Sequence, residues 1–186
     1  MPPAGPLIDP VLTPPPNRIS FSRGVLTRVR VEDAGEFEAA VAANAAHLRD
    51  WVPWADDPEG RHLRGGGAEA DWIGGVSYLY ALRPNLEGPV IGGLGLYRRV
   101  GDGGIEIGYW LAATHTGTGL ATEAVQALTT AALALTDVTR VEIHTDEANL
   151  PSAAIPQRLR YRLVRIEQVE ARTPAETGRL QVWVTP

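Results

Sequence analysis

The chain lacks cysteine and lysine altogether, so each of its 17 basic residues is an arginine. Without cysteine it can form no disulfide, cysteine nucleophile or thiolate metal site, and we expect no metal centre. Without lysine it cannot complete a P-loop, which ends on Gly-Lys-Ser or Gly-Lys-Thr. It also lacks an apolar run near the roughly 20 residues of a membrane span, and its N-terminus has no charged segment leading into an apolar one. These absences favour a cytoplasmic protein with no membrane partner.

Acidic residues outnumber basic ones, which gives a formal net charge of −5 at pH 7. A nucleic-acid binder is expected to present a basic face, so the charge argues against a nucleic-acid partner. It suits a cationic amine substrate better. Apolar residues make up 44% of the 186 positions, enough for one domain to bury a core.

Proline and glycine mark two irregular segments. Residues 1–17 hold seven prolines, and proline can neither continue a helix nor donate to a strand ladder, so we expect an extended arm there. The arm is either a flexible tail or a segment packed along the fold or against a second subunit, which would make a homodimer. Residues 18–186 are expected to form a single domain. Within it, residues 56–68 carry four glycines and no apolar period, which predicts a mobile surface loop.

Alternating and 3.6-residue patterns predict the elements of this domain. Helices are expected to begin at Asp33, Ala45, Ala68, Leu120 and Asn149. Strands are expected over residues 25–31, 76–83, 90–98, 105–111, 141–145, 161–169 and 180–184. Short turns between the second, third and fourth strands indicate an antiparallel meander, and a crossover helix makes the fifth strand parallel to the fourth. The predicted fold class is α+β, with a mixed, mostly antiparallel central sheet of six to seven strands flanked by helices.

The most informative stretch joins a strand, a glycine-rich turn and a helix between Ile105 and Ala134. In the turn, Gly117 and Gly119 stand among small residues directly before the apolar stripe of the helix. Such a turn directs several unpaired backbone N–H groups into one concavity at a helix N-terminus, where the helix dipole favours an anion. We therefore predict that residues 116–122 bind a phosphate-bearing ligand.

Three kinds of protein place phosphate on a turn of this type. The missing lysine excludes a P-loop, and a dinucleotide fingerprint needs a third glycine where Thr122 stands. The spacing Thr116-x-x-Gly119-x-Ala121 resembles the acetyl-CoA site of the GNAT acetyltransferases. The signature of that site is Gln/Arg-x-x-Gly-x-Gly/Ala, so the chain differs at the first position.

The resemblance extends from about Leu26 to Val184 and is strongest to the RimJ/RimL branch of that family. It is carried by residues 106–111, 121–124, 149–152 and 158–163, and by Asn44, Leu48, Trp51 and Trp54. The branch is known for acetylating protein N-terminal amines, with relatives that act on small amines. Two positions depart from it, because Thr116 replaces glutamine or arginine and Arg160 replaces a glycine.

This resemblance implies acetyl-CoA as cofactor and a sheet that splays between the fourth and fifth strands, where the pantetheine arm enters. It further implies a bulge near Trp110 and Leu111 that turns a backbone N–H toward the thioester carbonyl. In comparable sites, removing one such donor raises the activation free energy by about 3 to 4 kcal/mol. The implied cofactor-binding residues are Trp110, Leu111, Ala112, Thr116, Gly117, Thr118, Gly119, Leu120, Ala121, Thr122, Asn149 and Ser152.

Several side chains are candidates for catalysis. Ser152 is the implied proton donor to the leaving thiolate and Asn149 the implied partner of the pantetheine amide, although both also fit a plain helix cap. Glu106 is the candidate base and also a candidate acceptor-binding residue, the alternative being an exposed carboxylate on a strand edge. Competing bases are Glu167, Glu170, His115 and His144.

Trp51 and Trp54 are the remaining candidates for binding the acceptor. They lie three apart in a helix expected over residues 45–54 and ended by Pro53, so they should share one face. That face either packs on the core or lines the acceptor cleft, which this element flanks in the branch.

The expected reaction is direct attack of a neutral primary amine on the thioester in a ternary complex. A protein α-amine, with a pKa of ~7.7 to 8.0, becomes neutral at pH 7 for only ~1 kcal/mol, whereas a lysine at ~10.4 needs ~4.6 kcal/mol. This favours a protein or peptide N-terminal α-amine as acceptor. The alternatives are a small amine such as an antibiotic or polyamine, or a non-catalytic acyl-CoA-binding protein.

Overall fold

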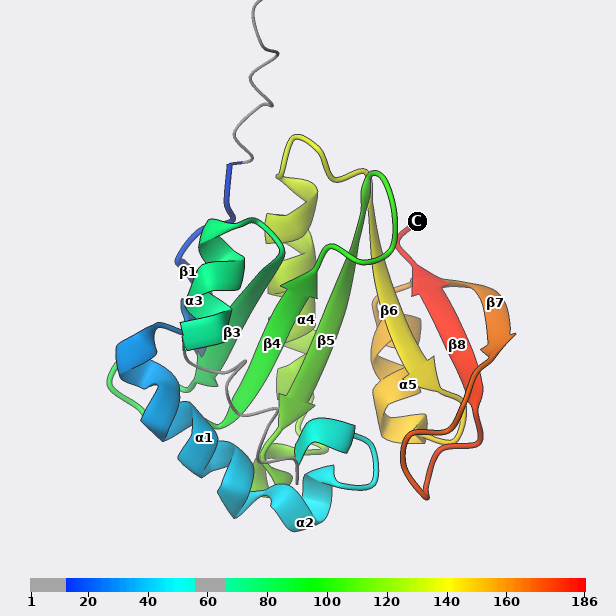
Figure 1. Ribbon diagram of the computed structural model, residues 1–186, viewed down its shortest axis with the longest axis horizontal. Coiled ribbons are helices and arrows are strands. Elements are labelled where there is room, and N and C mark those ends of the chain that lie inside the picture. Colours follow the sequence, from blue (N-terminus) through cyan, green and yellow to red (C-terminus); the bar gives the residue numbers. More distant parts are fainter. Residues whose placement is uncertain (1–12, 56–65) are drawn as a thin grey trace, which may run out of the picture.

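Eight strands form one open sheet in the order β1-β2-β3-β4-β5-β6-β8-β7 in the computed structural model, which describes residues 13–55 and 66–186 (Figure 1). The strands are β1 (Arg18–Phe21), β2 (Gly24–Arg28), β3 (Ser77–Arg83), β4 (Gly92–Tyr97), β5 (Gly104–Leu111), β6 (Arg140–Asp146), β7 (Arg162–Gln168) and β8 (Arg179–Val184). Only β5 and β6 are parallel among these pairs of neighbours. The predicted α+β class, the meander and the parallel pair are thereby confirmed.

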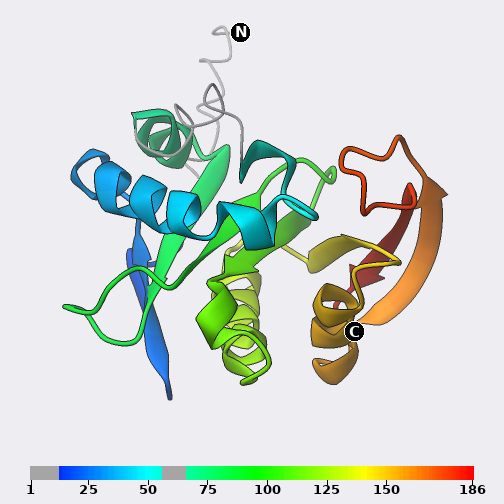
Figure 2. The ribbon, with the colours of Figure 1, turned by 90° about the horizontal axis from the view of Figure 1, so that it is seen from below.

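Helices cover both faces of the sheet, as the view from below shows (Figure 2). One face carries α1 (Ala34–Ala43), α2 (Ala45–Leu48) and α3 (Gly66–Ile73), and the other carries α4 (Leu120–Leu133) and α5 (Leu150–Arg158). Short 3-10 helices, η1 (Val31–Asp33), η2 (Pro53–Ala55) and η4 (Ala113–His115), lie in the connections.

The two faces of β5 enter two different cores because its side chains alternate. Ile105 and Ile107 are almost fully buried in the larger core, which α4 covers with Leu128. Trp110 packs into a smaller core beneath α1, where its ring meets Phe37 edge-on with centroids 5.7 Å apart. The alternation read from the sequence thus assigns each side chain of β5 to one side of the sheet.

Strand β1 was not expected, so the sheet has one more strand than the upper end of the predicted range. It pairs with β2 through a tight hairpin from Phe21 to Gly24. Four residues are too few to show a two-residue period, and only Ile19 and Phe21 among them are even partly buried. The predicted first strand also ends earlier, at Arg28, because η1 begins at Val31.

The predicted helix over 45–54 was wrong, since α2 ends at Leu48 and η2 begins at Pro53. Proline has no N–H to donate, and it disfavours helical geometry at Val52 before it. Trp51 and Trp54 consequently do not share one helical face. Neither belongs to the two cores, and Trp54 is 37% exposed.

The last residues of the proline-rich arm pack along the fold. Pro15 is buried, the Tyr80 hydroxyl donates to the Pro16 carbonyl at 2.8 Å, and the Arg28 N–H donates to the Asn17 carbonyl at 2.8 Å. For residues 13–17 the structure therefore favours the packed alternative. Residues 1–12 and most of the predicted mobile loop lie outside the described residues, and 66–68 of that loop belong to α3.

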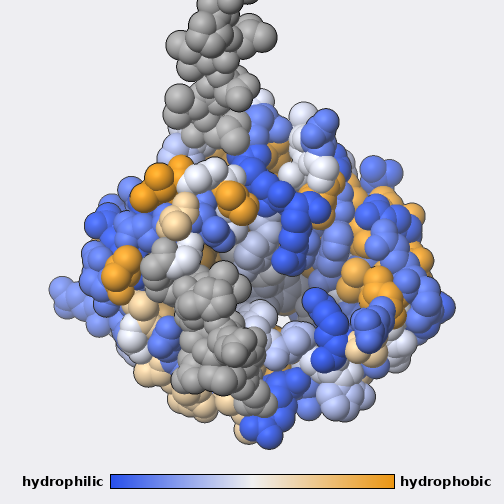
Figure 3. Space-filling view, viewed as in Figure 1, coloured by the Kyte–Doolittle hydropathy of each residue, from blue (hydrophilic) through white to orange (hydrophobic). Residues whose placement is uncertain are grey.

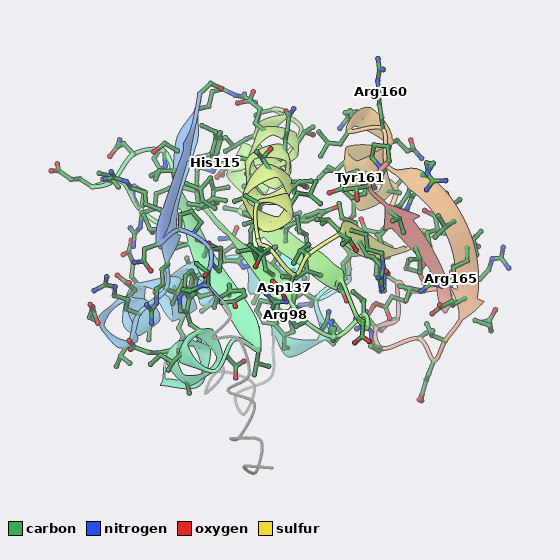
Figure 4. The ribbon with its side chains drawn as sticks, turned by 90° about the horizontal axis from the view of Figure 1, so that it is seen from above. Arg98, His115, Asp137, Arg160, Tyr161 and Arg165 are labelled. Atoms are coloured by element: carbon green, nitrogen blue, oxygen red, sulfur yellow. The ribbon has the colours of Figure 1, made fainter. Side chains whose placement is uncertain are left out.

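Arg160 follows α5 and has the left-handed backbone conformation that glycine usually adopts at a helix end. Its φ is 61°, and it is the only described residue other than glycine with a positive φ. The Tyr161 N–H donates to the Pro156 carbonyl at 2.9 Å and the Arg160 N–H to the Gln157 carbonyl at 3.1 Å, which are the two hydrogen bonds of a Schellman motif. The side chain projects from this end of the helix (Figure 4).

We therefore expect Arg160→Gly to stabilise the protein. A side chain at positive φ costs about 1 kcal/mol relative to glycine, so the thermal midpoint should rise by about 2 to 4 °C in a domain of this size. A thermal melt measures this. An unchanged or lower midpoint would mean that the exposed guanidinium contributes more than the backbone strain costs.

Candidate functional site

The parallel strands β5 and β6 separate after a short paired region. Their register runs from Gly104 opposite Arg140 to Glu106 opposite Glu142, whereas β5 continues to Leu111 and β6 to Asp146. The predicted splay is thereby confirmed. It opens a wedge at the carboxyl ends of the two strands, where open sheets bind ligands.

The backbone of β5 presents hydrogen-bonding groups to this wedge. Gly103 accepts from Thr139 on the β6 side, and Ala112 donates to Ile91 on the β4 side. Backbone groups alternate in direction along a strand, so the N–H and C=O groups of odd-numbered residues of β5 point toward β6. Tyr109 and Leu111 therefore direct these groups into the wedge.

The predicted bulge near Trp110 and Leu111 was wrong. The register between β4 and β5 is unbroken from Leu111 to Glu106. Glycines of β4 permit this close pairing, since a Cβ on Gly93 would lie 2.5 Å from the Trp110 Nε1. Divergence of β6 therefore replaces the bulge as the feature that exposes backbone donors. Leu111 lies at the wedge as expected, while the side chain of Trp110 is turned into the smaller core.

The glycine-rich turn has the predicted shape. Gly117 and Gly119 have φ of 72° and 82°, which side chains disfavour, and Gly119 caps α4. Thr116 and Thr118 bond back to the Ala113 and His115 carbonyls at 2.8 and 2.9 Å, which fixes the turn. It is exposed from Thr116 to Gly119, and a Cβ on Gly117 would touch nothing within 4 Å. Open space beside the N–H groups of a helix N-terminus fits a pyrophosphate.

Arg23 reaches this turn from the β1–β2 hairpin, a contact that no sequence pattern indicates. Its guanidinium donates to the Thr118 carbonyl at 2.9 Å and to Glu123 at 2.9 Å. Ser22 also donates to Glu123, and this bond and the arginine hold the pKa of the Glu123 carboxyl below its usual range. An arginine thus lies beside the turn although Thr116 does not supply one.

Asn149 and Ser152 lie at the start of α5, on the β6 side of the wedge. The Asn149 Oδ1 accepts from the Ser152 N–H at 3.2 Å, so the helix cap predicted for this pair is confirmed. The Ser152 hydroxyl donates to the Tyr109 hydroxyl at 3.0 Å, which in turn donates to the Ser152 carbonyl at 3.0 Å. Tyr109 thus joins β5 to α5 across the wedge.

Tyr109 was not among the predicted site residues, although the sequence held a signal for it. Pro156 stands four residues after Ser152 and has no N–H, so the Ser152 carbonyl needs another donor. The Tyr109 hydroxyl is that donor. Burial raises the pKa of Tyr109, while the hydrogen bond from Ser152 lowers it less, so the hydroxyl keeps its proton at neutral pH.

An acidic cluster occupies the other face of the sheet where the wedge begins. Arg99 clamps Glu106 with two hydrogen bonds of 2.7 and 2.6 Å, and Glu106 is only 6% exposed. Opposite it, Glu142 accepts from Arg140 Nε at 2.8 Å and lies 2.8 Å from His144 Nε2. Burial raises the pKa of Glu142, but these two partners outweigh it and hold it below its usual range.

The surface above this cluster is hollowed over β5 in the view from the α1 side (Figure 3). Residues of α2 and η2 lie along it, and the Thr173 hydroxyl donates to the Asp50 carbonyl at 2.6 Å, which joins the β7–β8 loop to the segment after α2. Asn44 accepts from the Ala113 N–H at 3.0 Å, so the junction of α1 and α2 is fixed to the end of β5. The role of Trp51 and Trp54 in binding an acceptor stays a prediction.

Of the four competing bases, His144 lies in the cluster, and Glu167, Glu170 and His115 lie outside it. Glu167 pairs with Arg165 on β7 at 2.5 Å, and the Arg165 side chain lies on that outer strand (Figure 4). Glu170 follows β7 and is exposed. His115 lies in η4 beside Thr114, with Nδ1 3.0 Å from its hydroxyl.

The model of the GNAT acetyltransferase domain family matches residues 23–162, about three quarters of the chain. The chain belongs to this family. It is therefore an N-acetyltransferase, and its acetyl donor is acetyl-CoA.

Several solved structures share this fold. The chain is similar to RimL, a ribosomal L7/L12 α-N-protein acetyltransferase in complex with coenzyme A, with a TM-score of 0.79, 19% identity and 90% of this chain and 97% of that chain covered. It is similar to Mycobacterium smegmatis RimJ in complex with CoA-disulfide (TM-score 0.78, 20% identity, 93% and 90% covered). It is also similar to the microcin C7 self-immunity acetyltransferase MccE in complex with acetyl-CoA and AMP, with a TM-score of 0.80, 17% identity and 95% of this chain and 99% of that chain covered.

A search of curated proteins finds no match. Among residues 13–55 and 66–186, no helix is long and apolar enough to cross a membrane. In the same ranges no three histidine or acidic side chains are grouped so as to hold a metal ion.

Proposed function

We propose that the protein transfers the acetyl group of acetyl-CoA to a primary amine, preferentially the α-amine of a protein or peptide N-terminus. One observation carries the proposal: the wedge between β5 and β6 opens toward the glycine-rich turn at one end and toward an acidic cluster on the opposite face. An anionic donor and a cationic acceptor can therefore approach the same strand edge from different sides.

In this proposal residues 116–122 hold the pyrophosphate, and Asn149 contacts the pantetheine amide. The N–H of Leu111 or Tyr109, which faces the wedge, donates to the thioester oxygen as it gains charge. The amine nitrogen bonds to the acetyl carbon, the carbon–sulfur bond breaks, and both substrates are bound together when this happens. The protein's part is to place the amine and donor in line and to move protons.

The acceptor class rests on two supports. Glu106 and Glu142 present carboxylate oxygens on the acceptor side, each paired with an arginine. An α-amine is neutralised at low cost, so it makes modest demands on a base. Several neighbours are described as acting on protein N-termini, RimL among them. Their identity to this chain is too low to transfer the substrate, so the acceptor must be measured.

A turnover screen tests the proposal. Acetyl-CoA consumption should be fastest with peptides that have a free N-terminal amine, and the same peptides with a blocked N-terminus should be inert. Faster turnover of polyamines or aminoglycosides would replace the peptide acceptor with a small amine. Tight acetyl-CoA binding with no turnover of any acceptor would instead indicate a non-catalytic acyl-CoA-binding protein.

The Tyr109–Ser152 pair should deliver the proton to the leaving thiolate. We expect Tyr109→Phe to lower kcat at least about tenfold, because general-acid groups contribute about 10²- to 10⁴-fold and Ser152 remains as a partial substitute. Affinity for CoA, measured by calorimetry, should change little. Ser152→Ala separates this role from capping, since it leaves the Asn149 side chain and the Ser152 backbone N–H in place. If Ser152→Ala leaves kcat unchanged while Tyr109→Phe lowers it, the tyrosine alone is the proton donor.

A further inference from the structure

The acidic cluster contains one histidine that the family resemblance does not account for. His144 lies on β6, its side chain is 17% exposed, and it lies on the same face as Glu142, two residues before it. Its Nε2 is 2.8 Å from a carboxylate oxygen of Glu142. An ionised carboxylate only accepts hydrogen bonds, so we assign the ring proton to Nε2, which leaves the lone pair of the neutral ring on Nδ1.

That lone pair faces Glu106 across a gap. The distance from His144 Nδ1 to Glu106 Oε2 is 3.8 Å, too long for a hydrogen bond. Two acceptors face each other there without a donor between them. An ammonium group carries three donors and a positive charge, so it is the chemical group that this gap favours.

The two glutamates are less suited to take a proton. Both oxygens of Glu106 are bonded to Arg99, and Glu142 is bonded to Arg140 and His144 and is 3% exposed. A guanidinium that stays bound to a carboxylate stabilises its charged form, so protonating either glutamate would break an ion pair. The His144 Nδ1 has no such partner.

The charged groups around His144 pair with one another. Glu106 and Glu142 face it from β5 and β6, Arg99 and Arg140 pair with these two carboxylates, and the Arg165 guanidinium on β7 lies 3.9 Å from Glu142. Arg165 pairs more closely with Glu167, at 2.5 Å, so three guanidinium groups and three carboxylates balance one another before the histidine is counted. A positive ring is therefore not required to balance the cluster.

An aromatic ring lies next to the imidazole at this level of the two strands. Two residues beyond the last paired positions, Glu106 and Glu142, the same face of the two strands carries Gly108 and His144. Gly108 has no side chain, and the ring of Tyr97 lies 3.1 Å from where its Cβ would be. The acceptor thus meets an aromatic ring and an imidazole at the point where β5 and β6 separate.

We propose that His144 Nδ1 is the general base of the reaction, with Glu142 as the residue that positions its ring and Glu106 as the anion that holds the acceptor ammonium. This assignment rests on the proposed acetyl transfer to a primary amine. The ammonium loses one proton to Nδ1, its nitrogen forms the bond to the acetyl carbon, and the sulfur departs with the electron pair of the carbon–sulfur bond. The hydroxyl pair of Tyr109 and Ser152 protonates the sulfur. The nitrogen, now bonded to the acetyl carbon, gives up its second proton, which restores the hydroxyl pair by way of solvent.

Two substitutions at this position test the assignment on the full chain, with the best acceptor peptide of the screen. His144→Gln keeps a donor for Glu142 but has no basic nitrogen, and His144→Ala leaves a cavity of imidazole size. Both should lower kcat/KM about 100-fold or more. Added imidazole should restore at least tenfold of the loss in His144→Ala and none in His144→Gln, whose side chain fills the space. The Kd for CoA, measured by calorimetry, should stay within twofold in both.

A further variant tests the role of Glu106. Glu106→Gln should raise KM for the peptide about tenfold with a smaller change in kcat. If Glu106→Gln abolishes kcat while His144→Ala keeps the kcat/KM of wild type, Glu106 is the base and the assignment is overturned. If the wild-type protein acetylates no acceptor, the proposed function itself is wrong and the role of His144 is refuted with it.

Discussion

Gly119→Asp is expected to weaken CoA binding at least tenfold. Gly119 is the left-handed cap of α4 with φ 82°, and its position lies beside the N–H groups that should hold the pyrophosphate. An aspartate there adds a negative charge where the ligand is negative, and its Cβ is disfavoured at this φ. The new carboxylate would also meet Arg23, whose guanidinium lies 3.4 Å from the Cβ position, and compete for it with Glu123.

Gly119→Asn is the matched control for this effect. Asparagine has nearly the same size and tolerates a left-handed backbone better than most residues, but it carries no charge. Calorimetry with CoA should therefore give Gly119→Asn a smaller loss than Gly119→Asp, and the difference should shrink at high salt. Equal losses would assign the effect to backbone shape alone, and an unchanged affinity in both variants would remove residues 116–122 from the cofactor site.

Signals confined to a few neighbouring residues predicted this part of the molecule well. Two glycines followed by a helical pattern predict the turn at 116–122, and both glycines have the positive φ that such a turn needs. The cap of α5 follows from Asn149 alone, and the left-handed Arg160 follows from its place after the helix. Such features depend on local sterics and hydrogen bonds, so the sequence carries them directly.

Contacts between distant segments could not be predicted in the same way. Arg23 meets Glu123 across 100 residues because the β1–β2 hairpin lies against α4, and that hairpin is too short to recognise. Arg99 pairs with Glu106 across the β4–β5 turn. The candidate base Glu106 is therefore a member of an ion pair. The bulge expected near Trp110 was wrong because the glycines of β4 let β5 stay in register, a property of two strands together.

Asp146, at the end of β6, connects the β6 side of the wedge to the β7–β8 loop. It ends β6, is only 6% exposed, and its Oδ1 accepts from the Ala148 N–H and the Thr177 hydroxyl, both at 2.9 Å. Its Oδ2 accepts from the N–H groups of Thr177 and Gly178, both at 3.0 Å. One buried carboxylate therefore fixes both the start of the α5 segment and the β7–β8 loop. Burial would raise the pKa of Asp146, but the hydrogen bonds from Ala148, Thr177 and Gly178 outweigh it and lower the pKa.

Asp146→Ala is expected to lower the free energy of unfolding by about 3 kcal/mol or more, because several donors lose a charged acceptor at about 1 to 3 kcal/mol each. The thermal midpoint should fall by about 6 to 12 °C. Asp146→Asn should lie between wild type and Asp146→Ala, since its oxygen can still accept from Ala148 and Thr177 while its NH₂ faces two donors.

The pH dependence of these melts supplies the control. The folded-state pKa of Asp146 is lowered, so its stabilising effect is fully present above the ordinary aspartate value of about 3.9 and is lost as pH falls through the folded value. The difference in midpoint between wild type and Asp146→Asn should therefore be constant from about pH 7 to 5 and shrink below about pH 4. A difference that stays the same at low pH would show that packing, rather than the charge of this carboxylate, joins β6 to the β7–β8 loop.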